Sequence, residues 1–472
     1  MANSGYILAG FETLATIVDN FFKGKRGRWE ENFTREQVSN FLSETCAGFL
    51  HSYGQDFGGK KKYNKYSQKE GDLYTKCRDM GIFDGCNLVA DSGGFQISVG
   101  DLSRRESEML FDMYYDWLRD YVDVYDRAFI LDVPPGPGCE IFRNFEDVYE
   151  LNLKSYLIAR DLPDEVRKKI VYIHHFRTPQ LWKIYTKIMK ENDLFPYFDW
   201  HGTGGIVANM SGDMAIPCII YILPIIPLIN EAMRHGRNYL NFHVLGGGSF
   251  RDIFFYELFM RIIKVKHNFD LNITYDSSMS WKQVMRARFI HVKDAEGYIK
   301  KMSIKTNNLP MRFQHESSSQ SDKTYHGLRV EETYERVLNE VAAKFNFKPI
   351  SIDGVYSSET GTFHEDIKVY SIFYTLNLFP TLQQEMKKVA ERIIPIYEAG
   401  EDELFYRECL DVTRHINQGS LTKKQRIKTR SISKSLDMLG QLDEDYCEYL
   451  VNTYLAKDEF VQLDESKRIL LC

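Results

Sequence analysis

Between about residue 86 and residue 280, short apolar runs alternate with longer stretches of helical periodicity. Each apolar run favours β structure and stops at a glycine, an aspartate or a histidine. This alternation is typical of repeated βα units, in which each strand leads into a helix. An earlier apolar run, Tyr6–Gly10, is a candidate strand near the start of the chain. The pattern predicts six further strands: Asn87–Ala90, Ala128–Leu131, Ile170–Ile173, Tyr197–Trp200, Leu240–Leu245 and Leu271–Tyr275.

The residues that follow these runs are mostly ones that can carry chemistry. They are Asp91, Asp132, His174 and His175, the segment His201–Gly205, the glycines Gly246–Gly248, and Asp276. In a (β/α)8 barrel the carboxyl ends of all strands converge on one face, and active sites lie there. We therefore predict an α/β protein of the TIM-barrel type, although the pattern does not resolve its first two strands.

The chain divides into three parts by pattern. Residues 1–305 are predicted to form the barrel domain, 306–329 a linker or flexible loop, and 330–472 a mainly α-helical region. The most apolar stretch, Met214–Ile229, is shorter than the roughly 20 residues of a membrane-spanning helix and is interrupted by Pro217, Pro224 and Pro227. We expect it to be a buried packing segment, and we expect no association with a membrane.

Charge and cysteine content narrow the class of protein. The 472 residues carry a formal charge of -6, so any contact with a polyanion must be local. The 8 cysteines form no CxxC pair, so we expect reduced thiols, no metal, and a cytoplasmic protein without a secretory signal. Basic clusters rich in aromatic neighbours, or helical in pattern, can bind phosphates, although a solvated surface is the simpler explanation of each cluster taken alone. Their candidate nucleic-acid-binding residues are Lys25, Arg26, Lys61, Lys62, Lys424, Arg426, Lys428 and Arg430.

Two carboxylates at the barrel face could share the work of displacing a group at an anomeric carbon. Asp91 ends an early strand and Asp276 the last one, so one could attack while the other protonates the departing group. Each taken alone could instead cap a turn or a helix. The glycines Gly204 and Gly246 could be simple turns, or they could let the backbone approach a planar ligand between Phe95 and Leu245.

The hexapeptide Asp91-Ser92-Gly93-Gly94-Phe95-Gln96 resembles the DSGGFQ motif of the tRNA-guanine transglycosylases. Later landmarks follow in the family's order, over roughly residues 86 to 280. Asp132 is similar to the family's base-reading acid, Gly204–Val207 to its GGLA loop, and His243–Gly248 to its LMGVG segment. Asp276 falls where the family keeps its nucleophile.

The resemblance implies a covalent base exchange that needs no redox or nucleotide cofactor. Asp276 would attack C1′ of a guanosine nucleotide while Asp91 protonates the leaving guanine, and Asp91 would then deprotonate an incoming 7-deazaguanine. Asp132 would read the guanine N1–H and 2-amino edge, and the Gly205 amide would donate to O6. Ser92 would position the base, with Phe95 and Leu245 stacking on its faces.

Two departures bear on the substrate. After its nucleophile the family carries a CxCxxC zinc site, whereas the next cysteine here is Cys409, so we expect no zinc subdomain. His175 stands in place of the family's glutamine on strand five, which implies a retuned base pocket. The chain therefore looks most like the DpdA-type DNA-guanine transglycosylases of phages and bacterial modification islands. Those enzymes insert preQ0-like bases into DNA, which protects the DNA from restriction. We expect DNA and a free 7-deazaguanine base as its partners, with base flipping of the target nucleotide.

Three alternatives remain open at this point. The first is a tRNA-directed enzyme that has lost its zinc. The second is a metal-dependent barrel hydrolase with ligands from His174 or His175, His201 and Asp276. The third is a non-catalytic subunit that only binds nucleic acid, although retention of both Asp91 and Asp276 argues against it. The oligomeric state is not readable from the sequence.

Overall fold

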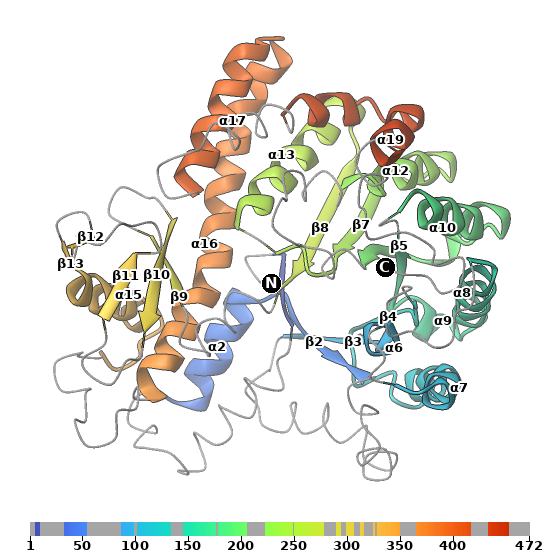
Figure 1. Ribbon diagram of the computed structural model, residues 1–472, viewed down its shortest axis with the longest axis horizontal. Helices are drawn as coiled ribbons and strands as arrows, with labels where there is room; N and C mark the ends of the chain where they lie inside the picture. The colour runs from blue at the N-terminus through green and yellow to red at the C-terminus, as the bar shows by residue number, and fades with distance from the viewer. Residues whose placement is uncertain are drawn as a thin grey trace, which may run out of the picture.

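Eight parallel strands close into a barrel in the computed structural model of this chain (Figure 1). The strand order follows the sequence, and β1 closes the barrel by pairing with β8. The strands are β1 (Tyr6–Ala9), β2 (Gly48–Ser52), β3 (Asn87–Asp91), β4 (Arg127–Phe129), β5 (Ile170–His175), β6 (Trp200–Gly204), β7 (Tyr239–Val244) and β8 (Asp270–Asp276). The structure describes residues 5–9, 33–53, 86–98, 102–133, 145–175, 178–204, 222–248, 250–277, 289–293, 299–305, 312–315, 324–325, 328–349, 365–416 and 433–452.

Helices surround the barrel and follow its strands in turn, so the predicted fold class is confirmed. The barrel helices are α2 (Arg35–Thr45), α6 (Gly94–Ser98), α7 (Arg104–Asp120), α8 (Phe145–Arg160), α9 (Asp164–Arg167), α10 (Pro179–Glu191), α12 (Ile225–Arg234) and α13 (Phe250–His267). Local sequence explains where several begin. Ser103 and Glu106 form a capping box at the start of α7, and Thr178 caps α10 ahead of Pro179.

The C-terminal region is helical, as predicted, and one of its helices completes the barrel. It comprises α15 (Val330–Lys344), α16 (Glu365–Glu398), α17 (Asp402–Ile416) and α19 (Glu444–Leu450). Helix α16 packs along α13 and also contacts α2 (Figure 1). Gln383 Oε1 accepts hydrogen bonds from the Gly5 amide at 2.6 Å and the Tyr275 hydroxyl at 3.2 Å. Phe379 stacks on Tyr6 with ring centroids 3.7 Å apart. Helix α16 thus covers the seam between β1 and β8, where a barrel's last helix normally lies.

Three sequence expectations need correction. Strand β2 was not predicted, because Gly48–Ser52 is short and lacks a clear alternation. The predicted strand Tyr197–Trp200 is wrong: Phe195–Tyr197 forms a 3₁₀ turn (η2) around Pro196, and β6 begins at Trp200. Part of the predicted linker 306–329 is also wrong, because strands lie within it and just before it. They are β9 (Phe289–Lys293), β10 (Ile299–Lys305), β11 (Arg312–His315), β12 (Thr324–Tyr325) and β13 (Leu328–Arg329).

The apolar stretch Met214–Ile229 was expected to be a packing segment, and its described part is one. Residues 225–229 open α12 and are all buried against the barrel, while residues 214–221 lie outside the described ranges. Among the helices that the structure describes, none combines the length and apolar character that crossing a membrane requires.

Candidate active site

Three carboxylates meet at the carboxyl ends of the strands, a region called here the barrel mouth. Asp91 is the last residue of β3, Asp276 the last of β8, and Asp132 follows β4. Asp91 and Asp276 are not on paired strands, because β1 and β2 lie between theirs. They are nevertheless close enough that the charges of Asp132 and Asp276 raise the pKa of Asp91. The mouth therefore brings together the three acids that the sequence singled out.

The surroundings of Asp91 suit a group that exchanges protons near neutral pH. Burial raises the pKa of Asp91 to about 7, and the neighbouring carboxylates add to the rise. Hydrogen bonds from the Ser52 hydroxyl and the Gly93 amide act in the opposite direction. Ser52 reaches Asp91 because the two residues are register partners on β2 and β3. Gly93 has φ 95°, a conformation that glycine adopts without strain and that turns the chain into α6.

Ser52 and Gln96 adjoin the candidate acid, and the sequence pattern did not single out this contact. Ser52 Oγ lies 3.1 Å from Gln96 Oε1, so its single proton is shared between Gln96 and Asp91. Gln96 was visible as the last residue of the hexapeptide, but nothing in the sequence paired it with Ser52. The contact explains why a glutamine suits that place: it holds the hydroxyl that contacts the proposed acid.

Asp132 is 6% exposed and is held between two side chains. His175 Nε2 bonds to Asp132 Oδ2, and Ser92 Oγ lies 3.5 Å from Oδ1. The Nδ1 atom of His175 is buried and has no hydrogen-bond partner within the described residues. A Cβ atom at Gly204 would lie 2.9 Å from His175 Cε1, so the ring requires a glycine there. His175 thus contacts Asp132, and Gly204 leaves room for the His175 ring.

The carboxylate of Asp276 is bound on one oxygen. Oδ1 accepts a hydrogen bond from the Gly246 amide at 2.7 Å and lies 3.2 Å from His243 Nε2. Gly246 has φ 74°, which aims its amide at this carboxylate and favours glycine. The Gly248 amide also bonds to the Asp276 carbonyl oxygen at 3.1 Å. The glycine-rich turn after β7 therefore binds Asp276 directly.

Other predicted residues are placed only in part. Leu245 is half-buried against the core, and its amide bonds to the Thr203 carbonyl oxygen at 2.9 Å. Phe95 lies in α6, and the structure describes its backbone but not its side chain. The predicted residues that fall outside the described ranges are Gly205, Lys25, Arg26, Lys61, Lys62, Lys424, Arg426, Lys428 and Arg430.

Two of the histidines proposed as metal ligands lie together, but away from Asp276. His174 Nε2 lies 3.4 Å from His201 Nδ1, and His201 stacks on Phe195 outside the barrel wall. His174 lines a small cavity with residues of α10 and α12, whereas Asp276 faces the mouth. Burial lowers the pKa of both histidines, to about 3 for His201. The described residues thus do not bring His174, His201 and Asp276 together.

Within the described ranges, three potential ligand atoms come within 4.8 Å of one another only at Asp193, Glu231 and His235. This group lies around the end of α12, away from the mouth. Glu231 there already pairs with Arg234 and His235. The geometry therefore does not favour the metal-dependent hydrolase.

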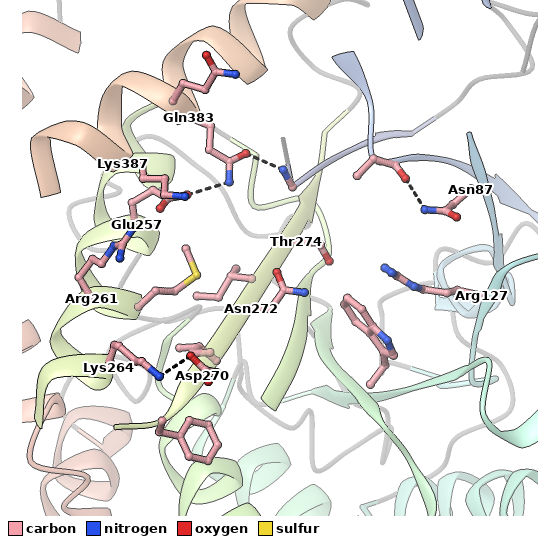
Figure 2. A pocket seen from close by; sticks show the side chains of 18 residues that line it. Asn87, Arg127, Glu257, Arg261, Lys264, Asp270, Asn272, Thr274, Gln383 and Lys387 are labelled. Atoms are coloured by element: carbon pink, nitrogen blue, oxygen red, sulfur yellow. Dashed lines mark hydrogen bonds and ion pairs between the residues drawn. The ribbon is translucent and has the colours of Figure 1, made fainter. Parts of the chain in front are cut away.

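A cavity of about 930 Å³ lies at the opposite, amino-terminal end of the barrel (Figure 2). The Arg127 guanidinium lies 3.6 Å from the centre of the Trp200 ring, and Gln383 joins the Gly5 amide to Glu257 across the cavity wall (Figure 2). None of the predicted site residues that the structure describes lines it. Residues at this end of such barrels generally serve stability rather than catalysis.

The fold and the mouth together define the class: a (β/α)8 barrel with a three-carboxylate site. No known protein-family model matches this chain, and no curated protein matches it either.

Proposed function

We propose that this chain is a DNA-guanine transglycosylase, which exchanges guanine in DNA for a 7-deazaguanine base through a glycosyl-aspartate intermediate. The observation that carries the proposal is that two different carboxyl groups lie in the same mouth. The pKa of Asp91 is about 7, and Asp276 accepts its hydrogen bonds from the described residues on Oδ1 alone. An acid that holds its proton near neutrality beside an available carboxylate oxygen is the arrangement that a double displacement requires.

The first half-reaction would release guanine. Asp276 Oδ2, which accepts no hydrogen bond from the described residues, attacks C1′ of the extruded nucleotide. The C1′–N9 bond breaks, and the proton of the Asp91 carboxyl group passes to the departing base, which leaves as neutral guanine. The products are a C1′–O ester on Asp276 and an ionised Asp91.

The second half-reaction would reverse these steps with a new base. Asp91 takes the N9 proton of the incoming 7-deazaguanine, N9 attacks C1′, and the bond to Asp276 breaks. Both acids return to their starting states, so the cycle consumes no cofactor. Asp132 and His175 would recognise the base edge, which their mutual contact supports, and Ser92 Oγ lies 3.5 Å from Asp132.

DNA rather than tRNA is proposed because the sequence resembles the zinc-free, DNA-acting branch of the transglycosylases. Purified protein would be incubated with labelled guanine and either duplex DNA or tRNA. We expect label in DNA, and label in tRNA alone would contradict the DNA proposal. Nucleoside mass spectrometry of DNA from cells that express the chain would then identify the inserted base.

A further inference from the structure

The strand β7 places a buried histidine directly beneath the proposed nucleophile. His243 is 1% exposed, and its register partner on β8 is Thr274, two residues before Asp276. The ring joins both residues: Nδ1 lies 2.9 Å from Thr274 Oγ1, and Nε2 lies 3.2 Å from Asp276 Oδ1. The Phe129 ring packs against the imidazole with centroids 5.0 Å apart. The imidazole is thus held on three sides.

These contacts settle which ring nitrogen carries a proton. The Oδ1 atom of an Asp276 carboxylate can only accept, so Nε2 of His243 must be the donor. Nδ1 lies 2.9 Å from the Thr274 hydroxyl, which also lies 3.5 Å from the Phe242 carbonyl oxygen. A chain of hydrogen bonds therefore links Thr274, His243 and the carboxylate.

The two donors to Oδ1 hold the plane of the carboxylate. One hydrogen bond from the Gly246 amide restrains rotation about the Cβ–Cγ bond from one direction only. A second donor on the same oxygen, coming from His243, restrains that rotation. The other oxygen, Oδ2, accepts no hydrogen bond from any described residue and is left to attack.

We propose that His243 is a positioning residue that aims Asp276 at C1′, an inference that rests on the proposed transglycosylase function. In the ester, Oδ1 becomes the carbonyl oxygen and keeps the same two donors. When the second half-reaction breaks the C1′–O bond, these donors stabilise the carboxylate that departs. His243 therefore serves both half-reactions without touching the substrate.

Three variants separate the hydrogen bond from simple packing. His243→Leu fills the space but has no donor. His243→Gln offers an amide N–H where Nε2–H lies, whereas the shorter carboxamide of His243→Asn reaches Thr274 but not Asp276. His201→Leu is the matched control, because His201 is equally buried on the neighbouring strand and is not part of the mouth.

The measurement is the rate of covalent protein–DNA adduct formation in a single turnover without added base, together with the dissociation constant for duplex DNA. We expect His243→Leu and His243→Asn to slow adduct formation by about 10- to 100-fold, because misplacing a reacting group is costly. DNA affinity should stay within about twofold, since only the chemical step is affected. His243→Gln should recover most of the rate, and His201→Leu should match the wild type.

The outcomes distinguish this inference from the proposed function. A wild-type protein that forms no adduct with DNA and exchanges no base overturns both. A wild type that reacts, with His243→Leu or His243→Asn reacting equally fast, overturns the positioning role alone. Equal slowing in His243→Gln and His243→Leu also overturns it, because the hydrogen bond would then be irrelevant. Should His243→Leu fail to fold, the comparison of the Gln and Asn variants still decides.

Discussion

Replacing Ser52 with alanine removes a hydroxyl that donates to the ionised form of Asp91. The hydrogen bond lowers the pKa of Asp91 against the effect of burial, so its loss should raise that pKa above its present value of about 7. The first half-reaction needs protonated Asp91 as its acid. Its rate should therefore hold at low pH and fall as pH rises through that pKa, and in Ser52→Ala the fall should begin at higher pH.

The magnitude follows from the sharing of the Ser52 proton. A hydrogen bond to a charged group contributes about 1.5 to 3 kcal/mol, and division between Asp91 and Gln96 Oε1 at 3.1 Å reduces this to about 1 kcal/mol. At 1.36 kcal/mol per pKa unit this is a rise of about 0.7 unit. At pH 8 the protonated fraction of Asp91 would then grow roughly fourfold, from about one tenth to about one third.

The assay is exchange of labelled guanine into DNA between about pH 5 and pH 9, with kcat/KM normalised to its low-pH plateau, since kcat/KM reports ionisations of the free enzyme. Ser107→Ala is the control, because it also removes a buried hydroxyl, from the surrounding helix α7. Its profile should overlay that of the wild type. A Ser52→Ala profile that stays in place, or moves to lower pH, would refute the assignment of Asp91 as the acid.

Three further outcomes are expected. Asp276→Ala should abolish exchange but leave the affinity for DNA largely intact, and unchanged exchange would refute the nucleophile assignment. Gly204→Ala places a Cβ atom 2.9 Å from His175 Cε1. We expect weaker binding of the free base in a titration, and a free energy of unfolding in urea that is lower by about 1 to 3 kcal/mol. Gln383→Leu leaves the Gly5 amide and Glu257 without this partner, so the free energy of unfolding should fall by about 1 to 3 kcal/mol. An unchanged midpoint of urea unfolding would show that these contacts of α16 do not stabilise the seam between β1 and β8.

Much of the barrel could be predicted because its strands are buried on both faces. The run that became β5 begins with four consecutive apolar residues, whereas those of β7 and β8 alternate apolar with polar residues, and a polar residue or glycine follows the apolar part of each. The closing of the barrel could not be predicted in this way. The contacts of α16 with Gly5 and Tyr275 join residues more than 100 positions apart, and no local pattern records them.

The acids of the candidate site were visible in the sequence, but their partners were not. Asp91, Asp132 and Asp276 each follow an apolar run, so the strand ends pointed to them. Ser52 and His243 act through residues on neighbouring strands, and those pairs depend on register. Register could have been inferred for His243, which is buried and alternates with Phe242 and Val244 on β7. It could not for Ser52, because β2 itself was missed.

The partners also distinguish the three carboxylates and the roles proposed for them. Asp132 contacts His175 and Asp276 contacts His243, so each of these two carboxylates has an imidazole as a hydrogen-bond partner. Within the described residues Asp91 has no such partner; it receives only a hydroxyl and a backbone amide. Burial and the charges of Asp132 and Asp276 raise the pKa of Asp91 to about 7. Asp91 is therefore the carboxylate of the mouth that suits the proposed acid, while His243 contacts the proposed nucleophile and His175 the proposed base-reading group.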